Sequence, residues 1–299
     1  MRKYNFISGL PRSGTTLLSA ILKQNPRFTA GISDAVQGFA AGIIDASNTG
    51  VGIDTTVTVE KRRDIIRGIF DTFYSDGNEV CFNTNRGWSG CTSLLKDLYP
   101  DFRMIICVRE IPWILDSFEQ LNSKNPYTVK ALYHHQQNLS VYERTQMLMG
   151  DLPNFAGYVA GPLANVKQSL FCNERNQICY VEYDDLVKNP LIIMKKIYAF
   201  LEEPWFEHDF ENVEDSYDEF DEGAKIEGLH RVRKRVEFKQ RRPILPNDLW
   251  HRYSSSSFWK DGFGELQKQL NWITSSDINI NVNQQSTVSK QLPKLNKQL

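Results

Sequence analysis

The stretch GLPRSGTT at residues 9–16 constrains the fold of this chain more than any other. A strand-like run of β-branched and aromatic residues, 3–8, precedes it, and a helical pattern with one apolar face follows it until Pro26. A Gly-x4-Gly loop between a strand and a helix is typical of phosphate sites, because successive backbone N–H groups and the helix N-terminus face the anion. The sequence therefore predicts an α/β fold with an anion site after its first strand.

The cations near this loop disfavour a nucleoside-triphosphate kinase. In such kinases a lysine follows the second glycine, and an acidic residue after a neighbouring strand holds Mg²⁺. Here Thr15 replaces the lysine, Arg12 is the nearest cation, and Arg109 follows the apolar run 103–108. Two arginines suit two anionic groups on one ligand, with no metal between them. A kinase on the same fold remains the alternative.

Two further strand–loop–helix patterns extend the first into a sheet. The apolar runs 103–108 and 178–183 are each followed by a polar turn and a helical pattern, as expected of parallel strands that are buried on both faces. We predict an α/β fold with a central parallel sheet flanked by helices and a core like that of P-loop nucleotide kinases. Helices are expected from Ile111 to about 121 and at 190–201, 61–74 and 126–149, and residues 31–52 are expected to be a loop or a loosely packed helix.

The domain organisation follows from composition. Of the last 25 residues, sixteen are Ser, Thr, Asn, Gln or Lys and none is aromatic, so this segment lacks the apolar surface needed to order itself. We expect one domain over residues 1–274 and a flexible tail over 275–299. Seven acidic residues lie between Glu211 and Glu222, and seven basic residues follow between Arg231 and Arg242. This pattern predicts two facing or successive surface segments.

Charge and cysteine usage exclude several classes of protein. The 299 residues are 41% apolar and 24% charged with a formal charge of −1, so a globally basic nucleic-acid coat is excluded and no nucleic-acid partner is expected. Five cysteines without a C-x-x-C pair indicate reduced thiols of a cytoplasmic protein. Neither a signal peptide nor a run of ~18 apolar residues is present, so no membrane association is expected.

Three motifs in order along the chain carry a resemblance to the sulfotransferase family. LPRSGTT at 10–16 looks like the family's 5′-phosphosulfate loop. Arg109, with Ser117 eight residues later, looks like its 3′-phosphate motif, and VEYDDL at 181–186 is similar to a third signature. GLHRVRK at 228–234 resembles a segment of bacterial members. The resemblance implies a metal-independent transferase that uses 3′-phosphoadenosine 5′-phosphosulfate and sulfates a hydroxyl or an amine.

The resemblance also implies a set of donor-binding residues. Arg12, Ser13, Gly14, Thr15 and Thr16 would hold the 5′-phosphosulfate and stabilise the charge that develops on the bridging oxygen as the S–O bond lengthens. The guanidinium of Arg109, which can bind a phosphate through two hydrogen bonds, and the hydroxyl of Ser117 would bind the ribose 3′-phosphate. Tyr183 would lie near the nucleotide. One or more of Arg231, Arg233 and Lys234 would close over it.

The catalytic base is expected at one of a few candidates. In the tyrosylprotein branch of the family a glutamate beyond the loop helix is the base, but Ser33 stands at that position here, and the nearby carboxylate is Asp34. Imidazole titrates near neutrality, so His134, His135 and His230 compete with Asp34 as proton acceptors. Of these three histidines, His134 is the one that we include with Asp34 among the predicted catalytic residues.

A third polar turn, after a strand-like run at 80–82, is expected at the same edge of the sheet. Arg86 in this turn is a candidate to stabilise the transferring group, and Asn85 and Trp88 are candidate acceptor contacts. The acceptor itself is left open between a small molecule, a sugar and a peptide. A non-catalytic anion-binding module is the second alternative, because the position of the family's glutamate is a serine.

Overall fold

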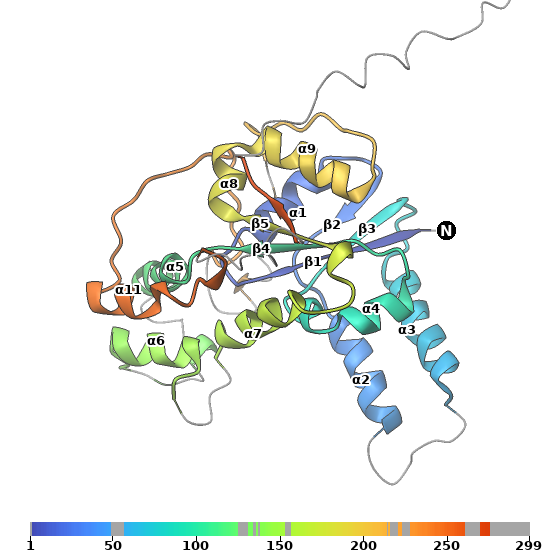
Figure 1. Ribbon diagram of the computed structural model, residues 1–299, viewed down its shortest axis with the longest axis horizontal. Coiled ribbons are helices and arrows are strands. Elements are labelled where there is room, and N and C mark those ends of the chain that lie inside the picture. The colour runs from blue at the N-terminus through green and yellow to red at the C-terminus, as the bar shows by residue number, and fades with distance from the viewer. Residues whose placement is uncertain are drawn as a thin grey trace, which may run out of the picture.

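Six parallel strands form one sheet in the computed structural model, in the order β2-β3-β1-β4-β5-β6 (Figure 1). The structure describes residues 2–48, 57–124, 131–133, 136, 138–152, 157–213, 215, 221–222, 228–260 and 270–275. The strands are β1 (Lys3–Gly9), β2 (Phe28–Ala30), β3 (Val80–Thr84), β4 (Met104–Val108), β5 (Ile178–Glu182) and β6 (Asn271–Ile273). The predicted α/β fold with a central parallel sheet flanked by helices is confirmed.

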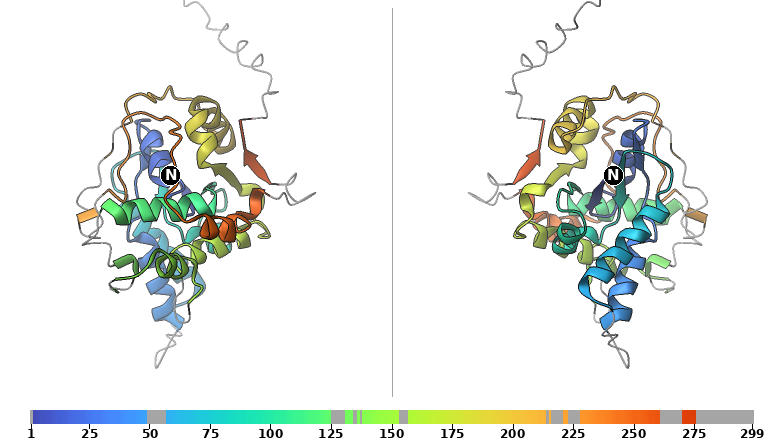
Figure 2. Two further views of the ribbon diagram at one scale, coloured as in Figure 1. Left: turned by 90° about the vertical axis from the view of Figure 1, so that its left-hand side faces the viewer. Right: turned by 90° about the vertical axis from the view of Figure 1, so that its right-hand side faces the viewer.

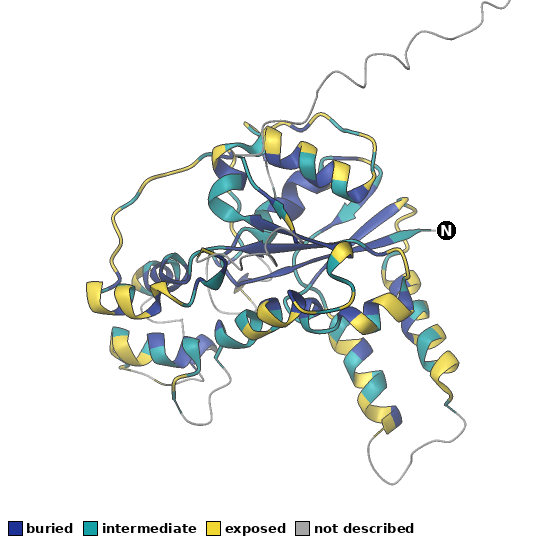
Figure 3. Cartoon of the chain, in the orientation of Figure 1, coloured by how far each residue is buried: buried dark blue, intermediate teal, exposed yellow. Residues whose placement is uncertain are grey.

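The central strands are buried on both faces, which explains their continuous apolar sequence. In β4, Met104 and Ile106 pack into the core on one side of the sheet, while Ile105 and Cys107 pack into the core on the other. This alternation follows from the two-residue period of a strand. In Figure 3 the central strands are mostly dark blue, and exposed positions lie on the helices and loops at the surface.

Helices cover both faces of the sheet, as Figure 2 shows by looking along the strands. One face carries α1 (Thr15–Lys23), α8 (Tyr183–Lys188) and α9 (Pro190–Leu201). The other core contains residues of α2 (Val36–Asn48), α3 (Val59–Phe73), α4 (Thr92–Leu98), α5 (Ile111–Lys124), α6 (Val141–Met149), α7 (Ala160–Ser169) and α11 (Asn247–Ser254). Short 3₁₀ helices are η1 (Trp88–Gly90), η2 (Ala131–Tyr133), η3 (Arg175–Gln177) and η4 (Phe258–Lys260). No helix in the described part of the chain is long and apolar enough to cross a membrane.

The predicted helix at 126–149 is confirmed over 141–149 but does not run through residue 138. Asn138 has a left-handed backbone conformation with φ 60°, and α6 begins only at Val141. Ser140 caps it: its hydroxyl accepts a hydrogen bond from the backbone N–H of Glu143, whose side chain in turn accepts one from the Ser140 N–H. A helix stop followed by a capping box therefore lies inside the polar stretch that sequence periodicity treated as continuous. The expected helices at 61–74 and 190–201 are confirmed, and 31–52 contains α2.

The acidic and basic runs face each other, as expected. The backbone N–H of Val213 donates to the carbonyl of Lys234 at 2.6 Å, and Arg235 pairs with Glu211 at 2.9 Å. All five cysteines are free thiols. The predicted tail at 275–299 lies outside the described residues except for Ser275, whose hydroxyl donates to Asp185.

Candidate functional site

A cleft of about 780 Å³ opens at the carboxyl edge of the sheet, beside the ends of β1 and β3. This is the edge at which parallel α/β sheets bind ligands, because the loops there join each strand to its helix. Its described lining is strongly basic: only Asp215 and Glu237 contribute carboxylates. The cations are Arg12, Arg86, Arg109, Lys124, Arg231, Arg233, Arg235, Lys239 and Arg241. Such an excess of positive charge in one concavity favours an anionic ligand.

The loop between β1 and α1 has a backbone that only glycine allows at two positions. Gly9 has φ 133°, and a Cβ there would lie 2.1 Å from the carbonyl oxygen of Cys107 in β4. Gly14 has φ 93°, and a Cβ would meet the ring of Tyr183 at 2.8 Å. Ser13 fixes the loop from beneath, since its buried hydroxyl lies within hydrogen-bond distance of the carbonyls of Leu10 and Cys107. The Ser13 side chain is thus directed into the protein and away from the cleft.

Arg12, Arg109 and Ser117 converge on one side of the cleft. Arg12 has a left-handed φ of 58°, and its Nε donates to Oγ of Ser117 at 3.1 Å. Arg109 follows β4 and its Nη1 lies 3.4 Å from the carbonyl oxygen of Arg12. Ser117 comes from two turns into α5, which is the separation that directs it toward the same place. The structure therefore brings together three residues that the sequence assigned to two phosphate motifs.

Within the described part of the chain, the guanidinium groups of Arg12 and Arg109 hydrogen-bond to uncharged oxygens. Burial lowers the pKa of Arg12 below its ordinary value, and the charge of Arg109 lowers it further. Burial also lowers the pKa of Arg109. The buried Nε of Arg109 has no hydrogen-bond partner among the described residues. Two partly desolvated cations with an unsatisfied donor would be stabilised by an anion at this position.

Tyr183 supports Arg109 from the side of β5. It is the first residue of α8, and the Cζ of Arg109 lies 4.3 Å from the centre of its ring. A cation over an aromatic face is attracted by the ring's electron density, by about 0.5–2 kcal/mol. Tyr183 therefore has a place in the cleft, as the sequence predicted, through its ring beside Arg109.

The remaining predicted donor residues are distributed around the cleft. Thr15 and Thr16, at the start of α1, line it. Arg231 and Arg233 line it from the exposed segment after residue 228, whereas Lys234 is outside the lining and its carbonyl pairs with Val213. Basic residues that sequence reasoning did not assign, such as Lys124 at the end of α5, also face the cleft. A lysine ending a helix carries no sequence signal that separates it from a solvated one.

Of the three predicted site residues in the turn after β3, two line the cleft and Trp88 lies in the core. Asn85 and Arg86 line the cleft, and Nη2 of Arg86 donates to the hydroxyl of Tyr158 at 2.8 Å. Trp88 is instead 1% exposed, within the aromatic core, and its indole N–H donates to Oδ1 of Asn83. The structure does not bring Trp88 to the cleft, because burying its large apolar ring outweighs exposing it at the loop. Tyr158, which the sequence did not single out, occupies the wall instead.

Asp34 is held by other groups outside the cleft lining. Its carboxylate accepts hydrogen bonds from the backbone N–H of Val36 at 2.9 Å, from the amide of Asn83 at 3.0 Å and from the hydroxyl of Tyr74. It precedes α2, and its hydrogen bond to the N–H of Val36 is that of a turn former. His134 and His135 lie outside the described residues. Of the histidines proposed as proton acceptors, His230 is the described one, and it lines the cleft.

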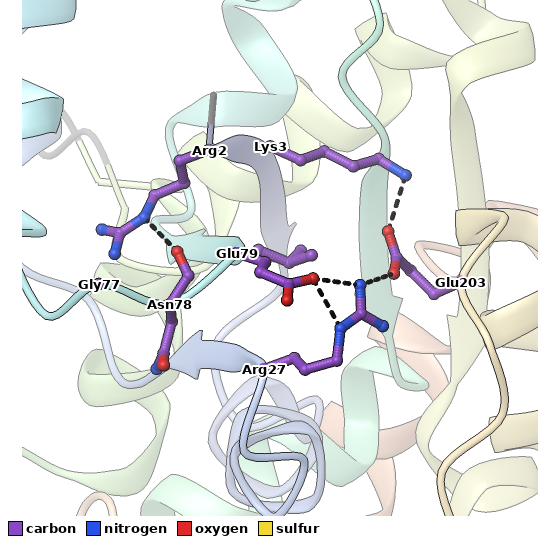
Figure 4. A pocket seen from close by; sticks show the side chains of 8 residues that line it. Arg2, Lys3, Arg27, Gly77, Asn78, Glu79 and Glu203 are labelled. Carbon is purple, nitrogen blue, oxygen red and sulfur yellow. Dashed lines mark hydrogen bonds and ion pairs between the residues drawn. The ribbon is translucent and has the colours of Figure 1, made fainter.

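A smaller hollow of about 580 Å³ lies at the opposite, amino edge of the sheet (Figure 4). Its charged groups satisfy one another: Lys3 pairs with Glu203 at 3.0 Å, and Arg27 pairs with both Glu79 and Glu203. The Nε of Arg2 donates to the carbonyl of Asn78 at 2.7 Å. This hollow is a structural ion-pair network, in contrast to the basic cleft with its unsatisfied donor.

A comparison with models of protein families identifies the family of this chain. The model of the sulfotransferase family matches residues 6–207. A sulfotransferase structure from Alicyclobacillus acidocaldarius shares 21% identity with a TM-score of 0.48, covering 70% of this chain and 84% of that one. The sulfotransferase domain of the curacin biosynthetic pathway shares 14% identity with a TM-score of 0.48, covering 91% and 98%. A mouse sulfotransferase complexed with PAP shares 15% identity with a TM-score of 0.43, covering 92% and 86%. No curated protein sequence matches the chain.

Proposed function

This chain belongs to the sulfotransferase family, and we propose that it transfers a sulfuryl group from 3′-phosphoadenosine 5′-phosphosulfate to a hydroxyl or amine acceptor. The observation that carries the proposal is the pair of partly desolvated arginines, Arg12 and Arg109, with the unpaired Nε of Arg109. A donor with a phosphosulfate and a separate 3′-phosphate supplies two anionic groups for two guanidinium groups. The five free thiols support a reducing, cytoplasmic compartment.

Each donor group has a set of side chains suited to it. Arg12, Thr15 and Thr16 would bind the 5′-phosphosulfate at the N-terminus of α1, where the backbone of Gly14 and its neighbours can approach an anion closely. Arg109 and Ser117 would bind the 3′-phosphate, with Tyr183 steadying the guanidinium of Arg109. Ser13 would contribute through its backbone, because its hydroxyl is engaged below the loop.

Cationic side chains of the cleft would stabilise the negative charge that develops during transfer. As the S–O bond lengthens, charge grows on the bridging oxygen, and preorganised donors there are worth a few kcal/mol each. Arg86, which contacts Tyr158, and the neighbouring Asn85 would lie beside the acceptor. Arg231, Arg233 and Lys234 belong to an exposed segment that could close over the nucleotide. The acceptor would be a small molecule, a sugar or a peptide, and no divalent metal is required by this residue set.

Calorimetric titration with adenosine 3′,5′-bisphosphate in EDTA tests the donor site. The wild type should bind it with micromolar affinity and bind ATP much more weakly. Arg12→Ala and Arg109→Ala should each weaken binding roughly 10–100-fold, because each removes a charged hydrogen-bonding group worth about 1.5–3 kcal/mol.

The matched control is Arg63→Ala, which removes an arginine of α3 that pairs with Asp97 outside the cleft lining. It should leave the affinity for the bisphosphate unchanged. Tight binding of ATP that depends on Mg²⁺ would show that the chain is a kinase rather than a sulfotransferase. An unaltered affinity of Arg109→Ala for the bisphosphate would show that Arg109 does not bind the 3′-phosphate. Donor binding without consumption of the donor with any acceptor would favour a non-catalytic module.

A further inference from the structure

Among the described residues of the cleft lining, one cation is not accounted for by the proposed donor. Nine lysines and arginines line the cleft there, and three of them contact carboxylates: Arg235, Lys239 and Arg241. The proposed function assigns five others to the donor or to the transferring group. These five are Arg12, Arg86, Arg109, Arg231 and Arg233. Lys124 is the remaining cation.

Lys124 lies in the last turn of α5, the helix that begins just beyond the end of β4 (Figure 1). Ser117, Leu121 and Lys124 all line the cleft, at the spacing of residues that share one face of a helix. At a rise of about 1.5 Å per residue, the backbone of Lys124 lies roughly 10 Å along the helix from that of Ser117. Lys124 therefore stands apart from the proposed 3′-phosphate site at Ser117.

Neutral side chains join Arg86 to Lys124 along this wall of the cleft. The Cζ of Arg86 lies 4.1 Å from the centre of the Tyr158 ring, and this ring packs edge-to-face against that of Phe118, with centroids 5.8 Å apart. Leu121 follows Phe118 by three residues on α5, and Lys124 follows Leu121 by three more. All five residues line the cleft. They form a row with a cation at each end and aromatic and aliphatic groups between.

The chemistry of this row describes the ligand that would fit it. Tyr158, Phe118 and Leu121 offer apolar surface, which favours an apolar or aromatic body. An ammonium group such as that of Lys124 donates charge-assisted hydrogen bonds to carboxylate or phosphate oxygens. Arg86 is at the end where the proposed function places the transferring group. The reacting hydroxyl of such a ligand would therefore lie near Arg86, with an anionic group at its far end.

We propose that the acceptor is an alcohol or phenol with an apolar body and an oxyanion remote from its reacting hydroxyl, and that Lys124 binds this oxyanion. The inference rests on the proposed sulfotransferase function and names the class of its acceptor. Lys124 is a specificity residue in this scheme, because it contacts the acceptor away from the reacting atoms. A neutral acceptor of the same shape binds less tightly, since it gains no charged hydrogen bond at this end.

Calorimetric titration of the protein saturated with adenosine 3′,5′-bisphosphate in EDTA tests this inference without turnover. The anionic probes are para-hydroxyphenylacetate and para-hydroxybenzylphosphonate, which distinguish a carboxylate from a phosphate-like group, and the neutral probe is para-hydroxyphenylacetamide. The wild type should bind at least one anionic probe about tenfold more tightly than the amide. In Lys124→Gln this preference should fall to about twofold or less, whereas Lys124→Arg should retain most of it.

The matched control is Lys167→Gln. Lys167 is also an exposed lysine in the last turn of a helix, α7, but it is outside the described lining of the cleft. A lysine that only stabilises the C-terminus of its helix affects stability in both places and leaves ligand preference unchanged. Lys167→Gln should therefore keep the preference of the wild type for the anionic probe.

Salt supplies a second readout that a purely structural lysine would not give. Raising the NaCl concentration to about 0.5 M should weaken binding of the anionic probe to the wild type and leave the affinity for the amide nearly constant, because salt screens an exposed ion pair. In Lys124→Gln both affinities should respond alike. Equal salt dependence of acid and amide in the wild type would contradict an ion pair at Lys124.

Three outcomes of the titration would overturn the inference. They are equal affinities of the wild type for acid and amide, no binding of either anionic probe, and a preference that survives in Lys124→Gln. Loss of bisphosphate affinity in Lys124→Gln as large as in Arg109→Ala would also overturn it, by placing Lys124 in the donor site. Failure of the wild type to bind the bisphosphate would instead remove the proposed function itself, so the two failures are distinguishable.

Discussion

Arg12 and Arg109, which we propose bind the donor, differ in their contacts from an arginine that serves the fold. Arg241, also in the cleft wall, pairs with the buried carboxylate of Asp116, whereas Arg12 and Arg109 lie beside each other with hydrogen bonds chiefly to neutral oxygens. Like charges that are partly desolvated destabilise the free protein, and such arrangements concentrate at functional sites. The free energy that this pair costs before binding is recovered when an anion separates the two groups.

His208 is a titratable residue that serves the fold. It is 5% exposed, its Nε2 lies 3.0 Å from the hydroxyl of Tyr198, and burial lowers its pKa from 6.5 to about 4. The unfolded chain binds a proton near pH 6.5 while the folded protein does not, so stability is complete above that pH and is lost as the pH falls toward 4. We expect this residue to lower the free energy of unfolding by roughly 2 kcal/mol between pH 7 and pH 5.

Urea unfolding of the wild type and His208→Gln at these two pH values checks this expectation. The variant should lose about 2 kcal/mol less than the wild type over the interval, because carboxylates titrate alike in both. His251→Gln should keep the pH dependence of the wild type, since its side chain is exposed. Equal pH dependence of the wild type and His208→Gln would refute the burial of a neutral imidazole at this position.

At the scale of elements, α5 anchors the segment that forms one wall of the cleft. Asp116 is fully buried, and its Oδ1 accepts hydrogen bonds from the backbone N–H groups of Ile244 and Leu245, at 2.6 and 3.0 Å. Its Oδ2 accepts from Arg241, whose guanidinium also lies over the ring of Trp113. One carboxylate thus ties residues 241–245 to the helix that also carries Ser117.

Removing this carboxylate should destabilise the whole fold. We expect Asp116→Ala to lower the free energy of unfolding by roughly 3–5 kcal/mol, because it leaves a cation and two backbone N–H groups, that of Leu245 buried, without an acceptor. Chemical denaturation followed by tryptophan fluorescence measures the change. Asp97→Ala, which breaks an ion pair whose carboxylate is 45% exposed, should cost about 1 kcal/mol or less. Similar losses in both variants would contradict the role of Asp116 as an anchor.

For the whole molecule, the distribution of charge matters more than its sum. The formal charge is −1, yet the cleft collects nine lysines and arginines against two carboxylates among its described lining residues. Acidic residues outside the lining compensate, for example Glu211, which pairs with Arg235. The field at the cleft mouth should attract an anionic ligand over long range.

The rate of ligand association should therefore depend strongly on salt. Between 50 and 500 mM NaCl we expect the association rate constant of adenosine 3′,5′-bisphosphate to fall about tenfold, with a smaller change in dissociation, because salt screens the long-range attraction. Stopped-flow fluorescence measures both constants. A tenfold fall of affinity carried by dissociation alone would show that short contacts, and not the field of the cleft, respond to salt.

Most of the residues that the sequence motifs predicted to bind the donor line the cleft. These are Thr15, Thr16, Arg109, Ser117 and Tyr183, which follow parallel strands of the sheet. The residues predicted to act on the acceptor are less often found there. Trp88 lies in the core and Asp34 is hydrogen-bonded to Asn83 and Tyr74, although both follow the same kind of polar turn.

The sequence by itself determined the strand–loop–helix units, because backbone propensity, glycine positions and apolar periodicity are local properties of neighbouring residues. It also determined that two arginines follow neighbouring strands, which parallel pairing then brings to one edge. Only the tertiary structure decided side-chain direction: Arg12 reaches the carbonyl of Leu229, 217 residues away, and the carboxylate of Asp221 contacts the ring of His230. Such choices depend on packing and charge between distant segments, and no local pattern encodes them.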